Sequence, residues 1–172
     1  MAGSMFGRKL DDLIPGTKFT YRQAVKSTEA VRHGLDNLPT NEEVWKRIEW
    51  FAKHILQPIS DIIPITVNSW FRSPELCKVT PGSSPSSNHT RGDCADIEPK
   101  SPNTPNIELF NLCAAKFDCA ELIAEFFPDG WVHCCCKNGA TGDVVKLKDA
   151  QHNYTRLTAE QIYALYKYKP KY

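Results

Sequence analysis

Two histidines and an aspartate stand at a spacing that suits a metal site. His89 and Asp96 lie seven residues apart, and His133 follows 37 residues after Asp96. Two imidazoles and a carboxylate can fill three corners of a zinc tetrahedron, and a catalytic zinc site leaves the fourth open for water. Five histidines in 172 residues will often give such a pattern by chance, so the residue types alone leave this interpretation open.

Three motifs around these residues, in the same order, resemble those of the M15 zinc D-Ala-D-Ala carboxypeptidases. The segment 87–96 resembles their S-x-H-x-x-G-x-A-x-D signature, and 130–133 resembles the W-x-H motif that supplies the third ligand. The segment 69–76 is similar to S-G-Y-R-S-P-x-L, and 19–58 resembles the helical lead-in of the phage-type branch, in subfamily A of the M15 peptidases. The resemblance covers about residues 18–136.

The resemblance assigns roles to individual residues. It makes His89, Asp96 and His133 the ligands of one Zn²⁺ ion. Arg72 matches the family arginine beside the metal, where a planar and permanently charged guanidinium can bind a substrate carboxylate or polarise the scissile carbonyl. Ser87 is expected to shape the loop or to contact the substrate.

The general base is less clearly marked. Several members of the wider family place an acidic residue three positions before the last ligand histidine, and this chain has Gly130 there. Glu125 matches the acidic residue of the L-x-E-F segment of the phage-type branch, and Asp129 lies four residues before His133. We favour Glu125 as the catalytic base, with Asp129 as the alternative. Trp131 either packs in the core or forms an aromatic wall of the substrate cleft.

The seven cysteines include the consecutive run Cys134, Cys135 and Cys136, and none forms a C-x-x-C pair. We expect reduced thiols, and a structural metal held by Cys134 and Cys136 has weak support. Cys94 replaces the alanine that is usual in the family, and Cys135 falls on the same face of its predicted strand as His133. A thiolate from either would close the zinc site and abolish hydrolysis.

Helical and strand patterns position these residues. A capping box at 40–43 and apolar residues at helical spacing predict a helix over 40–57 that Pro58 interrupts, and 72–88 is predicted to be a long loop. The other predicted elements are strands at 65–70, 95–98, 120–126, 131–137 and 143–148, a turn at Asn138-Gly139, and helices at 104–116 and from 158 onward.

These elements predict one α+β domain over residues 5–172, with N-terminal helices packed on an antiparallel sheet. Its fold would be of the hedgehog and D-Ala-D-Ala peptidase type, with 149–172 as a C-terminal helical extension. Residues 1–4 look like an expression scar.

Charge and hydropathy exclude other classes. The chain carries 21 Lys and Arg against 20 Asp and Glu, a formal net charge of +1, which disfavours a general binder of nucleic acid. No apolar run approaches the roughly 20 residues that span a bilayer, and the N-terminus lacks an apolar leader. We expect a monomer that is made in the cytoplasm.

The resemblance implies a zinc peptidase that hydrolyses a peptide bond in peptidoglycan, as a D-Ala carboxypeptidase or as an endopeptidase of the stem or cross-link. A phage-encoded endolysin or virion component would reach the cell wall after synthesis in the cytoplasm. The alternative is a non-catalytic virion or cell-wall-binding protein, since the hedgehog signalling domain resembles this fold and keeps a related zinc site in a binding role.

Overall fold

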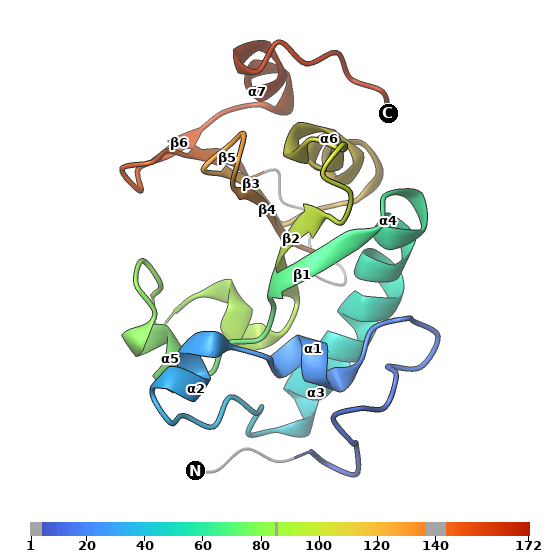
Figure 1. Ribbon diagram of the computed structural model, residues 1–172, viewed down its shortest axis with the longest axis vertical. Helices are drawn as coiled ribbons and strands as arrows, with labels where there is room; N and C mark the ends of the chain where they lie inside the picture. The colour runs from blue at the N-terminus through green and yellow to red at the C-terminus, as the bar shows by residue number, and fades with distance from the viewer. Residues whose placement is uncertain (1–4, 85, 137–143) are drawn as a thin grey trace. The chain divides into compact units, whose positions relative to one another are not determined.

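The computed structural model of the protein describes residues 5–84, 86–136 and 144–172 (Figure 1). The expected scar at 1–4 and the expected turn at Asn138-Gly139 lie outside these residues. The chain forms two compact units, of which the first comprises Met1–Pro58 with Ser69–Ala95 and the second comprises Ile59–Asn68 with Asp96–Tyr172. The α+β class is confirmed, because helices accompany a six-stranded sheet.

The first unit is helical around an aromatic core. Trp45 and Phe51 are fully buried, and the ring of Trp70 packs against that of Phe51 with centroids 5.9 Å apart. Its helices are α1 (Tyr21–Val25), α2 (Thr28–Arg32), α3 (Glu42–Phe51), the π-helix η1 (Ala52–Leu56), α5 (Pro74–Val79) and the 3₁₀ helix η2 (Asn88–Arg91).

The predicted end of the long helix at Pro58 is wrong. The helical path continues from α3 through η1 into α4 (Gln57–Ile62). A proline inside an α-helix removes one backbone bond and crowds the carbonyl four residues earlier. The π-turn, which the amide of Gln57 closes on the carbonyl of Ala52, places Pro58 in the first turn of α4, where an amide needs no helical partner.

The predicted long loop at 72–88 is also wrong in part, because it contains α5. The hydroxyl of Ser73 accepts a hydrogen bond from the amide of Leu76, and Pro74 occupies the first helical turn. Both features are strong helix starts. The short helix then buries Leu76 and Cys77, and this burial stabilises it despite the surrounding proline and serine residues.

The sheet is mixed, and not antiparallel throughout as predicted. Its strand order is β1-β2-β4-β3-β5-β6. Strand β3 pairs antiparallel with β4 on one side and parallel with β5 on the other, and β5 pairs antiparallel with β6. Instead of forming a hairpin with β4, β5 therefore joins the opposite edge of β3. The strands are β1 (Ile65–Ser69), β2 (Cys94–Pro99), β3 (Glu121–Glu125), β4 (Trp131–Cys135), β5 (Val144–Lys148) and β6 (Tyr154–Arg156), of which β6 was not predicted.

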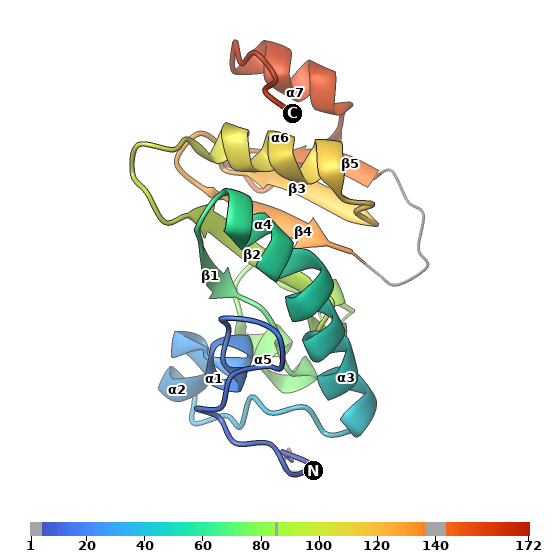
Figure 2. The ribbon, with the colours of Figure 1, turned by 90° about the vertical axis from the view of Figure 1, so that its right-hand side faces the viewer.

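Helix α6 (Asn106–Lys116) packs against β3 and β4 in the second unit (Figure 2). Successive residues of a strand point to opposite faces, so Leu122 and Cys134 share one face of this strand pair while Glu121 and His133 share the other. Helix α6, which contacts both strands, has buried apolar residues that include Leu109, Phe110 and Leu112. The opposite face is left for polar side chains.

Helix α7 (Ala159–Leu165) follows β6 and begins with a capping box in which Thr158 and Gln161 bond each other's backbone amides. This confirms the predicted last helix. No helix among the described residues is long and apolar enough to cross a membrane.

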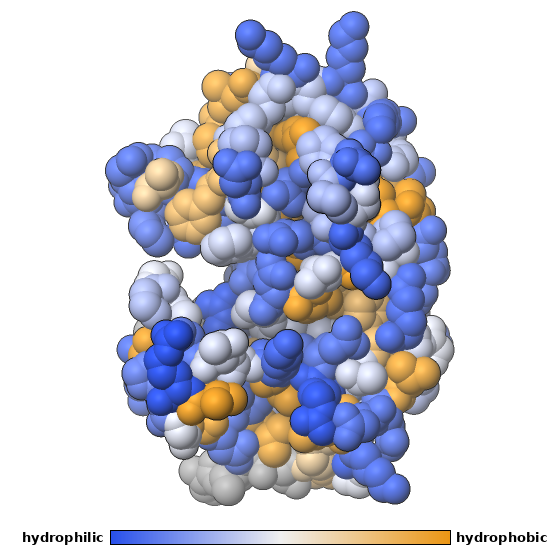
Figure 3. Space-filling model, in the orientation of Figure 1, coloured by the Kyte–Doolittle hydropathy of each residue, from blue (hydrophilic) through white to orange (hydrophobic). Residues whose placement is uncertain are grey.

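Hydrophilic side chains dominate the face drawn in Figure 3. The large apolar side chains that are exposed belong to different elements, as is ordinary for a protein surface. They are Phe6, Leu13, Val31, Ile62, Val79, Tyr154, Leu165 and Tyr172.

Candidate metal and catalytic site

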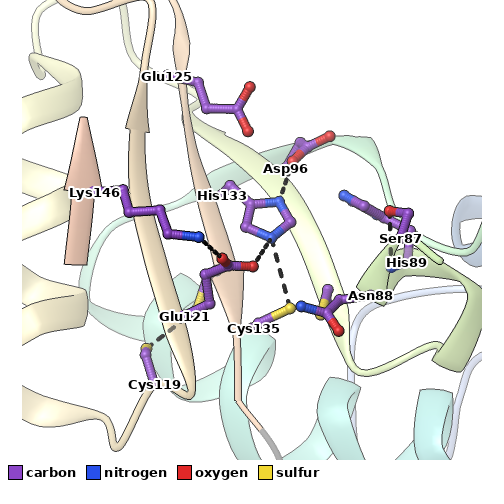
Figure 4. A network of polar contacts seen from close by, with 12 residues as sticks. Ser87, Asn88, His89, Asp96, Cys119, Glu121, Glu125, His133, Cys135 and Lys146 are labelled. Carbon is purple, nitrogen blue, oxygen red and sulfur yellow. Dashed lines mark hydrogen bonds and ion pairs between the residues drawn. The ribbon is translucent and has the colours of Figure 1, made fainter. Parts of the chain in front are cut away.

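Asp96 on β2 and His133 on β4 form a buried pair in the second unit (Figure 4). The Nδ1 of His133 lies 2.8 Å from Oδ1 of Asp96, and each residue is only 5% exposed. The sequence predicted both as metal ligands, and the structure brings their donor atoms together.

A second carboxylate reaches the same imidazole. Oε2 of Glu121 lies 3.6 Å from Nε2 of His133, and its other oxygen accepts a hydrogen bond of 2.6 Å from Lys146. Burial lowers the pKa of His133, but the contacts with Asp96 and Glu121 raise it more, to about 9. The contact with His133 is also the main cause that lowers the pKa of Glu121 to about 2. Two carboxylates, those of Asp96 and Glu121, therefore contact this imidazole and place negative charge beside it.

Sequence reasoning missed Glu121 and Lys146. Glu121 lies opposite Cys135 in the β3–β4 register, and the neighbouring pair on that face joins Ile123 to His133. The sequence signal that could have indicated Glu121 is the alternation of strand residues, which places Glu121 and Glu125 on one face. Recognising the lysine as its partner also required the parallel pairing of β5 with β3.

Glu125, the favoured base, lies at the other end of β3 on the face of His133. It is 6% exposed and accepts a hydrogen bond of 2.9 Å from Lys148. Burial lowers the pKa of Lys148, but hydrogen bonds with Tyr154 and Glu125 outweigh it and raise the value. Lys148 was not predicted, although it holds the candidate base in place.

The turn before β4 explains why no acidic residue stands three positions before His133. A Cβ atom on Gly130 would lie 1.9 Å from the carbonyl oxygen of Glu125, so no side chain fits. The Gly130 amide donates to the carbonyl of Phe126 at 2.9 Å. Asp129, the alternative base, is exposed in this turn, whereas Glu125 is buried. Of the two candidate bases, Glu125 is therefore the one that shares a strand face with His133.

Trp131 has features of both predicted roles. Its ring packs edge to face on Phe126, with centroids 5.2 Å apart. Its indole N–H is buried and has no hydrogen-bond partner among the described residues. A buried donor without a partner is costly, so this N–H is a natural contact for a ligand carbonyl on the His133 face.

His89 is held in the first unit at the start of η2. Its Nδ1 donates to the carbonyl of Trp70 at 2.6 Å, because a carbonyl oxygen can only accept. In the neutral ring, Nε2 then carries the lone pair that a metal ligand needs. The Ser87 hydroxyl, predicted to shape the loop or to contact the substrate, accepts from the His89 amide at 3.4 Å. Gly92 ends η2 at φ +82°, a conformation that favours glycine.

Arg72 lies beside His89 in the same unit. Its amide donates to the carbonyl of His89 at 3.3 Å, and its guanidinium donates to Ser69 at 2.9 Å and to Ser83 at 3.2 Å. These bonds orient the cation that the sequence assigned to substrate binding and catalysis.

Asn37 fixes the segment that carries Arg72, and sequence reasoning missed it. This buried amide donates to the carbonyls of Val25 and Phe71 at 2.8 and 3.1 Å and accepts from the amide of Ser73 at 2.7 Å. It therefore ties three distant backbone segments together. Its sequence neighbours contain no motif that could have indicated this.

The cysteines correct one prediction and remove one alternative. Cys94 and Cys135 are each disulfide-bonded, so in this oxidised state neither presents a thiolate that could close a zinc site. The prediction that all the cysteines are reduced is therefore wrong. Five others are free thiols: Cys77, Cys113, Cys119, Cys134 and Cys136.

The described residues thus include groups of His, Cys and carboxylate side chains that could hold a metal ion. Asp96, His133 and Glu125 belong to the second unit, while His89, Ser87 and Arg72 belong to the first. Only six residues separate His89 from Asp96 along the chain. Strand β2 starts in the first unit and continues into the second, so it carries the chain from one unit to the other.

Comparison with known proteins gives one match. The family model described as Peptidase M15 matches residues 17–135. No curated protein and no solved structure matches the chain. The matched segment covers more than half of the sequence and includes every residue of the candidate site named above except Lys146 and Lys148. The chain therefore belongs to the Peptidase M15 family of metal-dependent peptidases.

Proposed function

We propose that this protein is a zinc-dependent peptidase that hydrolyses a peptide bond in bacterial peptidoglycan. The observation that carries the proposal is the buried pair of Asp96 and His133, with the carboxylate of Glu121 beside the same imidazole. Membership of the peptidase family supports peptide-bond hydrolysis. The peptidoglycan substrate rests on the resemblance of the three motifs to D-Ala-D-Ala carboxypeptidases.

The donor set fits zinc, with His89, Asp96 and His133 as ligands. Two imidazoles and one carboxylate form a common ligand set for catalytic zinc. The bond from His89 Nδ1 to Trp70 leaves Nε2 as the coordinating atom, and such a contact orients a ligand imidazole. A zinc ion held there supplies Lewis acidity to a scissile carbonyl and makes water a better nucleophile near neutral pH.

Glu125 serves as the general base in this proposal. Its carboxylate takes the proton of the attacking water and later hands it to the leaving amine. Lys148 holds this carboxylate by a hydrogen bond of 2.9 Å, so the base keeps one orientation. Burial of both side chains excludes bulk water from the pair.

Arg72 binds the substrate carboxylate in this proposal, and the indole N–H of Trp131 bonds a substrate carbonyl. A guanidinium can bind a carboxylate through two parallel hydrogen bonds, and Ser69 and Ser83 already orient that of Arg72. A D-Ala carboxypeptidase and an endopeptidase differ in whether this carboxylate ends the peptide. A phage-encoded enzyme that reaches the wall after lysis, or within a virion, fits this substrate.

Mass spectrometry of fragments released from purified peptidoglycan tests the proposal. We expect the zinc-loaded protein to release new peptide ends, whose masses identify the bond. EDTA and Glu125→Gln should both abolish release, while the Gln variant keeps its zinc. Glu43→Gln, on the exposed surface of α3, is the matched control. A zinc-loaded protein that releases nothing would instead support a non-catalytic wall-binding or virion role.

A further inference from the structure

A second cluster of metal-binding side chains lies in the second unit, and the proposed peptidase site does not use it. Cys119 precedes β3, Cys134 lies on β4, and Cys136 follows β4 directly. Their Sγ atoms lie within a few ångströms of one another: 3.5 Å from Cys119 to Cys134, 3.5 Å from Cys134 to Cys136, and 2.9 Å from Cys119 to Cys136. All three are free thiols.

These distances suit shared coordination better than a disulfide. A disulfide brings two sulfur atoms to about 2.05 Å, and every pair in this cluster is farther apart. Ligands at about 2.3 Å from a tetrahedral zinc ion lie about 3.8 Å from one another. Two of the three sulfur-to-sulfur distances, both 3.5 Å, are close to this ligand-to-ligand distance. A single disulfide would also leave one of the three sulfur atoms unpaired.

Helix α6 supplies a fourth sulfur. The thiol of Cys113, which is buried on this helix, lies near enough to Cys134 to be the largest cause that raises the pKa of that thiol. Cys119, Cys134 and Cys136 form one group that could hold a metal ion, and a fourth thiol from α6 would complete the Cys₄ donor set of structural zinc sites. Soft thiolates also select zinc over the hard ions Mg²⁺ and Ca²⁺.

We propose that Cys113, Cys119, Cys134 and Cys136 bind a structural Zn²⁺ ion, separate from the catalytic one. Each thiol loses its proton on binding. The ion would tie α6 and the segment before β3 to the end of β4, on the face opposite His133. It fills all four positions with protein ligands, so it leaves none for water and serves stability instead of hydrolysis.

Cobalt substitution and zinc analysis test this site. The protein, purified under nitrogen without a reductant so that Cys94 and Cys135 stay disulfide-bonded, and loaded with Co²⁺, should show a thiolate-to-cobalt charge-transfer band. Cys119→Ser should lose that band and one zinc equivalent per chain. Cys77→Ser, which changes a free and buried cysteine on α5, should keep both. His133→Ala should lose one zinc equivalent but keep the band.

A measurement on the unaltered chain guards against a variant that fails to fold. Alkylation followed by mass mapping should find Cys113, Cys119, Cys134 and Cys136 protected by zinc and released by a chelator. Absence of the band and of this protection would overturn the proposal, as would a disulfide found between Cys119 and Cys136. Because the band reports thiolates alone, failure of the catalytic site would leave this result unchanged.

Discussion

The ten residues of β3 and β4 form two faces, and the two faces differ in the kind of side chain they bury. One face presents Leu122 and Val132 toward α6, and the other carries His133, Glu121 and Glu125. Apolar burial stabilises the first face in proportion to the area removed from water. The second buries charged groups, and these persist only because each has a partner. The stability of the strand pair and its chemistry are therefore separable by mutation.

His133→Ala should give the largest functional effect, and it should also lower stability because it removes the imidazole that contacts the buried carboxylate of Asp96. The variant loses a zinc ligand and the centre of the contacts with Asp96 and Glu121, so hydrolysis should fall to background. Zinc analysis and circular dichroism, measured together, would show a folded chain that lacks its catalytic ion. Full activity in this variant would refute the assigned ligand set.

Lys148→Met should lower the free energy of unfolding by about 3–5 kcal/mol, because it leaves the buried carboxylate of Glu125 without its partner. Replacing both residues by Met should recover most of this stability, since no charge then stays buried. Urea denaturation of the single and double variants measures the difference. Equal stability of all these chains would show that the pair is solvated.

Leu122→Ala should destabilise the protein by about 2–5 kcal/mol through the cavity it leaves on the apolar face. In contrast to His133→Ala, it should keep stoichiometric zinc and its turnover at low temperature. Thermal unfolding and zinc content, taken on one sample, check both halves of this prediction. A Leu122→Ala variant that is fully folded but has lost zinc would mean that packing on the apolar face controls metal binding on the other face.

Asn37→Ala should have the smallest effect, about 1–3 kcal/mol, because it leaves backbone groups of Phe71 and Ser73 unsatisfied. Since these residues flank Arg72, we also expect a raised KM with a smaller change in kcat. Asn41→Ala, which removes only the cap of α3, is the control for stability alone. An unchanged KM would argue against a positioning role.

Local sequence patterns predicted most of the elements and indicated part of the candidate site. His89 and Asp96 stand in one short motif, and alternation around His133 placed Cys135 on its face. Local patterns could not indicate Lys146 and Lys148. These lysines meet Glu121 and Glu125 only because β5 pairs in parallel with β3, and β4 lies between those two strands in the sequence. Asn37 acts through backbone groups 12 and 34 residues away, and such contacts leave no periodic signature.

The turn at Gly130 prevents this chain from carrying acidic side chains at both position 125 and position 130. An acidic side chain at this position would begin with a Cβ atom that collides with the backbone of Glu125 itself. Gly130→Glu, made to imitate the wider family, would therefore displace the very carboxylate it was meant to reinforce. Moving an acidic residue to position 130 therefore requires exchanging the whole segment from Glu125 to Gly130, and not one residue.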